Sequence, residues 1–205
     1  MTEVAREEPG PRAPGLRERS KARRKDAIIR AAYRLFAERG YDATTVADIA
    51  AEAEVAPRTV AMYFPSKQDI ALSRFTEAAD DLTAALRDRA AGETAARIVR
   101  RWLRAGERPA DYELRQLSKQ MFAANPGLNA LRNARMSAVI AEGAAALAAE
   151  LGCLAGDPGP RIAATAAAAV LIELTDIPLG PGRDEAMTVA FRFLEAGITA
   201  LRPAG

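Results

Sequence analysis

The stretch Thr44–Lys67 reads TTVADIAAEAEVAPRTVAMYFPSK and contains two short helical patterns joined by a tight connection. In the first pattern, apolar residues recur at the i, i+3, i+4 and i+7 positions that share one helix face. These residues are Val46, Ile49, Ala50 and Ala53. Thr44 or Thr45 is suited to cap this helix, because a hydroxyl at that position accepts a hydrogen bond from an unpaired amide.

The second pattern begins at Ala56-Pro57 and continues to Phe64. Proline suits the first helical turn, where its missing N–H leaves no hydrogen bond unmade. Pro65 ends this helix, and Ser66 is placed to cap the next one. Two short helices joined by about three or four residues are typical of a helix-turn-helix unit, whose second helix fits the major groove of DNA.

Several motifs around this stretch occur in a fixed order and spacing. They are YRLFAERGY at 33–41, TTVADIA at 44–50, VAPRT at 55–59 and YFPSK at 63–67. Together they resemble the DNA-binding domain of tetracycline-repressor-like (TetR) regulators, over roughly residues 24–72. The resemblance implies an all-α fold, with an N-terminal three-helix helix-turn-helix DNA-binding domain and a larger C-terminal helical ligand-binding and dimerisation domain.

Composition also favours helix. The chain has 205 residues, 49% of them hydrophobic, which is enough for a small domain and a larger one, or for a single domain with a sizeable core. Alanine dominates, and runs of β-branched and aromatic residues are sparse. The net charge is +2, but cations outnumber acids between Arg17 and Arg34, a local excess that suits an anionic partner.

Histidine is absent from the chain, which excludes a Ser-His-Asp or Cys-His catalytic site and a histidine-ligated metal site. A single cysteine, Cys153, excludes an internal disulfide. Neither a signal peptide nor an apolar run of membrane-spanning length is visible. We therefore expect a cytoplasmic protein with no membrane partner, and neither enzyme activity, cofactor nor metal.

The pattern divides the chain into three parts. Residues 1–19 are predicted to form a disordered basic arm, which would be able to enter the minor groove of DNA. Residues 20–67 are predicted to form the helix-turn-helix DNA-binding domain, whose first helix runs from about residue 20 to Arg39 and ends at Gly40. Residues 68–205 are predicted to form the helical effector-binding and dimerisation domain.

Six further helices are expected beyond the helix-turn-helix unit, at about residues 66–90, 94–105, 110–124, 128–151, 160–177 and 184–201. The resemblance implies that the last two pair with their copies across a two-fold axis and form a homodimer. The alternative is that both helices only cover the core of a monomer. A dimer would place two recognition helices about 34–36 Å apart, one turn of DNA, on a pseudo-palindromic operator.

Eight residues are expected to contact double-stranded DNA: Thr44, Thr45, Arg58, Thr59, Ala61, Met62, Tyr63 and Lys67. The Arg58 guanidinium is suited to guanine O6 and N7, and the Thr59 hydroxyl to a base edge or a phosphate. The Thr44 and Tyr63 hydroxyls and the Lys67 ammonium are suited to phosphates. Each of these three has an alternative: Thr44 as a cap only, Tyr63 as a core residue, and Lys67 as a solvated charge.

The helix-turn-helix unit departs from the family pattern at two positions. Glu54 stands where the connection often has glycine; at a positive φ, a residue other than glycine would be strained. Ala61 stands where relatives often carry an aromatic that reaches DNA, and it offers only a methyl group, for example to a thymine methyl.

The resemblance also implies a small-molecule pocket in the C-terminal domain, and an apolar or amphipathic effector that releases DNA. The residues suited to line it are Trp102, Leu117, Met121, Phe122, Met136 and Ile140. Each of them is also a candidate for the core, because a methionine or aromatic residue at helical spacing lies in a core more often than in a pocket. Glu173 and Asp176 are acids within an apolar helical pattern, and we expect them to face water or a partner charge.

Two other functional classes remain as alternatives. A non-specific architectural DNA binder would bind operator and random DNA with similar affinity, because phosphate charge provides nearly all of its binding. A small cofactor-free enzyme would use paired carboxylates such as Glu173 and Asp176, but it would leave the helix-turn-helix unit unexplained.

Overall fold

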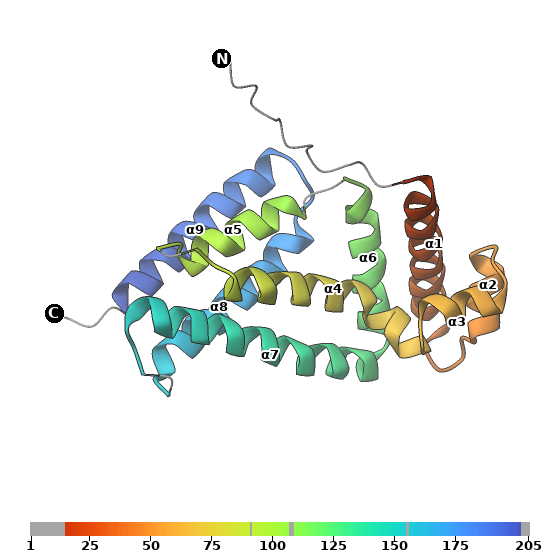
Figure 1. Cartoon of the computed structure of the whole chain (residues 1–205), viewed down its shortest axis with the longest axis horizontal. Coiled ribbons are helices and arrows are strands. Elements are labelled where there is room, and N and C mark those ends of the chain that lie inside the picture. The colour runs from red at the N-terminus through yellow and green to blue at the C-terminus, as the bar shows by residue number, and fades with distance from the viewer. Residues whose placement is uncertain (1–14, 91, 107–108, 155, 202–205) are drawn as a thin grey trace, which may run out of the picture.

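The computed structural model of the chain describes residues 15–90, 92–106, 109–154 and 156–201. Every regular element in these ranges is an α-helix, as predicted (Figure 1). The helices are α1 (Leu16–Arg39), α2 (Val46–Glu52), α3 (Pro57–Tyr63), α4 (Lys67–Arg87), α5 (Ala95–Ala105), α6 (Pro109–Ala124), α7 (Pro126–Leu151), α8 (Pro158–Asp176) and α9 (Pro181–Ala200).

Local signals account for most helix starts. Proline occupies the first turn of α3, α7, α8 and α9, where its missing N–H loses no hydrogen bond. Ser66 and Thr94 cap α4 and α5 by accepting from the amides of Asp69 and Arg97. One boundary was predicted wrongly. Residues Leu16–Arg19 form the first turn of α1 rather than part of a disordered arm, and residues 1–14 of that arm lie outside the described residues.

The helices form two apolar cores. Figure 1 shows α1, α2 and α3 at one end of the molecule, with α6 beside α1, while α4 and α7 run together towards α5, α8 and α9. The first core joins α1, α2 and α3 to the start of α4, to α6 and to the start of α7. The second core joins the rest of α4 and α7 to α5, α8 and α9.

The first core crosses the domain boundary predicted at residue 67. Ile70 and Leu72 of α4 are 0% and 1% exposed, and Met121 and Phe122 of α6 are 0% and 4% exposed, all within that core. Packing therefore places α6 with the helix-turn-helix unit, although the helices that come after α6 along the chain contribute to the second core.

Candidate nucleic-acid interface

The start of α2 is held by a reciprocal pair of hydrogen bonds between Thr45 and Asp48. The Asp48 amide donates to the Thr45 hydroxyl at 3.1 Å, and the Thr45 amide donates to the Asp48 carboxylate at 2.8 Å. This arrangement satisfies two amides that the helix itself leaves without partners. Hydrogen bonds from the Thr45 side chain and backbone lower the pKa of Asp48 below its ordinary value. Of the two adjacent threonines, Thr45 is therefore the cap.

The connection between α2 and α3 turns at Glu54, which has a φ of 53°. Glu54 is the only residue other than glycine with a positive φ among the described residues. Its amide donates to the Ala51 carbonyl at 3.1 Å, and the Val55 amide donates to the Ala50 carbonyl at 2.9 Å. These bonds close α2 tightly and confirm that Glu54 occupies the left-handed region, where glycine would be unstrained.

One face of α3 is free to meet a partner. Val60 on the opposite face is 1% exposed and packs in the first core, whereas Met62 is 71% exposed. Arg58 and Ala61 are also exposed. An exposed stripe with one guanidinium and two apolar side chains matches the guanine edge and thymine methyl groups of a major groove.

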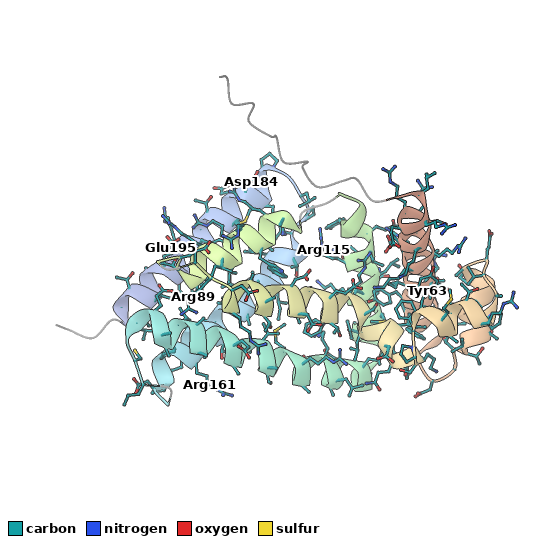
Figure 2. All side chains as sticks on the ribbon, viewed as in Figure 1. Tyr63, Arg89, Arg115, Arg161, Asp184 and Glu195 are labelled. Carbon is teal, nitrogen blue, oxygen red and sulfur yellow. The ribbon has the colours of Figure 1, made fainter. Side chains whose placement is uncertain are left out.

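Thr59 and Tyr63 flank this stripe and are half-buried. Tyr63 lies at the end of α3 (Figure 2) and packs against the first core while keeping part of its surface exposed. Both interpretations given for Tyr63, core residue and phosphate contact, are therefore compatible with its position.

Thr44 points into the protein. Its side chain is among the most buried polar groups, 1% exposed, and its hydroxyl donates to the Gly40 carbonyl at 2.8 Å. This geometry is that of a cap on the end of α1 rather than of a phosphate contact. We therefore remove the Thr44 hydroxyl from the proposed interface, and Thr45 remains exposed at the same helix start.

The Lys67 ammonium is largely occupied by contacts within the protein. Its ammonium donates to the carbonyls of Tyr41 and Thr44 at 2.6 and 2.7 Å, and it lies 4.3 Å from the centroid of the Tyr41 ring. A cation in the first turn of a helix is opposed by the helix dipole, so two carbonyl acceptors and an aromatic face explain its place. An ammonium has three donors, which leaves one for a phosphate.

Part of the basic stretch in α1 is also neutralised within the molecule. Lys25 pairs with Glu77, and Arg34 pairs with Glu52 at 2.5 Å. Exposed cations remain on the first turns of α1, without an ion-pair partner among the described residues: Arg17, Lys21, Arg23 and Arg24. The electrostatic footprint predicted between residues 17 and 34 is thus concentrated at the start of α1.

The six residues predicted to line an effector pocket are not brought together. Leu117, Met121 and Phe122 lie in the first core, whereas Trp102 and Ile140 lie in the second, and Met136 is half-buried outside both. An open concavity of about 490 Å³ follows α8. It is lined by Pro158, Arg161, Ile162, Thr165, Ala166 and Ala169, and by none of the six.

Among the described residues, no helix combines the length and the apolar character that a membrane crossing requires. Glu173 lies exposed on α8, as expected for an acid that faces water, and the side chain of Asp176 lies outside the described residues.

Comparison with known proteins agrees with this geometry. The family of bacterial regulatory proteins called tetR matches residues 28–73, from α1 to the first turns of α4. The HTH-type transcriptional regulator TcmR of Streptomyces glaucescens is 45% identical over 83 residues, which are 40% of this chain and 37% of TcmR. Residues 28–73 belong to the TetR family. The alignment spans just over a third of the length of this curated relative.

The whole fold is shared with solved TetR-like structures. Salmonella enterica GusR is 20% identical, with a TM-score of 0.62 over 88% of this chain and 96% of that chain. A regulatory protein of the tetR family from Rhodococcus RHA1 is 18% identical, with a TM-score of 0.53 over 89% of this chain and 98% of that chain. At these identities the likeness concerns the TetR fold alone.

Proposed function

We propose that this chain is a sequence-specific, DNA-binding transcriptional regulator that reads its operator with α3. The observation that carries the proposal is the exposed stripe of Arg58, Ala61 and Met62 on a helix whose opposite residue, Val60, is fixed in the first core. A rigid support behind an exposed reading face is what discrimination between bases requires.

Arg58 provides the sharpest test. Its replacement by alanine should weaken operator binding by about 1–3 kcal/mol and relax the preference for guanine at one position. Operator fragments would first be selected from genomic DNA with the unsubstituted chain, and affinities then measured for operator and random duplex at one salt concentration. Equal affinities of the unsubstituted chain for both duplexes would instead favour a non-specific architectural binder.

We propose that the regulator is a homodimer formed through α8 and α9. Large apolar side chains stand exposed on both helices: Ile162 at 65%, Ile172 at 47%, Val189 at 55% and Phe193 at 64%. Two neighbouring helices that expose this much apolar surface resemble one half of a helical bundle interface. Light scattering coupled to size exclusion at micromolar concentration tests this proposal, and a monomeric mass would refute it.

Release of the operator by a small, largely apolar effector is the remaining part of the proposal, and it rests on the family resemblance. An effector acts only through its different affinities for the DNA-binding and released conformations. Because five of the six predicted pocket residues are divided between two cores and Met136 lies outside both, we place no effector site on them. Repression rather than activation is proposed on the same resemblance.

A further inference from the structure

Asn125, at the junction of α6 and α7, reaches across to the end of α1. Its side-chain amide donates to the Phe36 carbonyl at 2.9 Å and to the Met121 carbonyl at 2.7 Å. Its side-chain carbonyl accepts from the Tyr41 amide at 2.7 Å. All three bonds of the Asn125 side chain are therefore made to backbone groups. Two of them, to Phe36 and Tyr41, reach α1 and the loop that follows it.

Because of these bonds, the Asn125 side chain does not cap its own helix, α7. Asn125 precedes α7, a position where asparagine commonly caps its own helix, yet it makes no side-chain bond to the α7 amides. Pro126 follows and has no amide to satisfy. The Asn125 side chain therefore bonds to the end of α1 rather than to the start of α7.

The segment held by Asn125 is the loop of residues 40–45, which leads directly into α2. Lys67 at the start of α4 holds the same loop through the Tyr41 and Thr44 carbonyls. The Thr44 hydroxyl ties the loop to Gly40, which has a φ of 86°. The loop is therefore fixed between the α6–α7 junction and the start of α4, and its last residue, Thr45, caps α2.

The geometry points to Asn125 as a positioning residue for DNA binding, which sets the pose of α2 and α3 relative to α6 and α7. This inference rests on the proposed function of the chain. A rearrangement of α6 against α7 would displace the Asn125 side chain and release the loop at Tyr41. Because apparent affinity falls with the fraction of molecules in the competent pose, loss of the restraint weakens operator binding without removing any DNA contact.

The test compares the full chain with its Asn125→Ala and Asn125→Asp variants. Alanine removes all three bonds, and aspartate keeps an acceptor for the Tyr41 amide but cannot donate to Phe36 or Met121. Asn133→Ala, an exposed asparagine on α7, controls for the change of side chain. Leu147→Ala, in the second core, controls for loss of stability as such.

The expected result is a roughly five- to thirtyfold weaker operator affinity for Asn125→Ala, the factor of one or two net hydrogen bonds. Affinity for random duplex should not change. Hydrogen exchange at the Tyr41 amide should accelerate in Asn125→Ala, remain slow in Asn125→Asp, and be unchanged in both controls. If Asn125 only stabilised the fold, its loss would lower the affinities for operator and random duplex alike. Asn125→Ala would then also bind DNA as an equally destabilised Leu147→Ala variant does.

Two results overturn the inference. One is wild-type operator affinity in Asn125→Ala, and the other is an equal loss of operator affinity in Leu147→Ala at matched melting temperature. Failure of the proposed function is a different result, in which the unsubstituted chain itself prefers no genomic fragment. In that case unchanged Tyr41 exchange in Asn125→Ala would still refute the restraint on the loop.

Discussion

Replacing Glu54 with glycine should stabilise the protein. The residue has a φ of 53°, and a side chain in the left-handed region costs of the order of 1 kcal/mol relative to glycine. Glu54 is exposed, and no ion pair is found for it among the described residues, so little interaction energy is lost. The larger entropy of glycine in the unfolded chain offsets part of the gain, about 0.4–1 kcal/mol.

The net stabilisation is therefore between about zero and 0.6 kcal/mol. For a chain of 150–250 residues, 1 kcal/mol corresponds to roughly 2–4 °C in melting temperature. Differential scanning calorimetry at one scan rate resolves a shift of 1 °C. We expect Glu54→Gly to melt higher than the unsubstituted chain.

Glu54→Ala is the matched control, because it removes the carboxylate but keeps the Cβ atom and therefore the strain. Its melting temperature should stay close to that of the unsubstituted chain. A Glu54→Gly variant that melts at or below the Glu54→Ala variant would refute the assignment of backbone strain to this turn. A rise of equal size in both variants would show that charge, not backbone geometry, is responsible.

Three further predictions concern the helix-turn-helix unit and the proposed dimer interface. Lys67→Ala should weaken binding to all DNA sequences alike and also lower the melting temperature, because the Tyr41 and Thr44 carbonyls lose their donor; equal melting temperatures would contradict the second part. Because its folded-state pKa is lowered, Asp48 contributes stability above its unfolded pKa and loses it as the pH falls through the folded value. Thermal unfolding across the acid range should therefore show a smaller loss of stability in Asp48→Asn, and parallel curves would contradict it. Phe193→Glu should convert the proposed dimer to a monomer by light scattering, since a carboxylate would be buried in an apolar interface; a retained dimer would place the interface elsewhere.

Local chemistry made the helix-turn-helix unit predictable from the sequence. Pro57 marks one helix start because it has no N–H to leave unpaired, and Ser66 marks the next because its hydroxyl accepts a hydrogen bond from the Asp69 amide. The family pattern raised a positive φ at position 54, where relatives often have glycine, and the structure gives Glu54 a φ of 53°. Such features depend on residues a few positions away along the chain, so they are visible in the sequence itself.

Long-range partners were not predictable in the same way. Lys67 bonds to carbonyls 26 and 23 residues away, and Asn125 bonds to Phe36 across 89 residues. The pattern Asn-Pro-Gly at 125–127 indicated a break between helices, but nothing in it indicated the side chain's partner. Thr44 and Thr45 are chemically identical, and only the path of the chain decides which hydroxyl points inward.

The same reason limits the effector prediction. Met121 and Phe122 lie on an apolar helical stripe, and a stripe shows that a face is buried without showing which core it joins. In the structure that face of α6 packs against α1.

That packing has a consequence for exchanging modules between regulators of this kind. A chimaera joined just after residue 67 would separate α1 from Leu114, Met121 and Phe122, which fill one side of the first core. A foreign C-terminal segment would have to bring its own α6 with a matching surface, or the donor segment would have to include α6 through Asn125. The seam for recombination is therefore discontinuous in sequence, because α6 packs in the first core while α5, which precedes it along the chain, packs in the second.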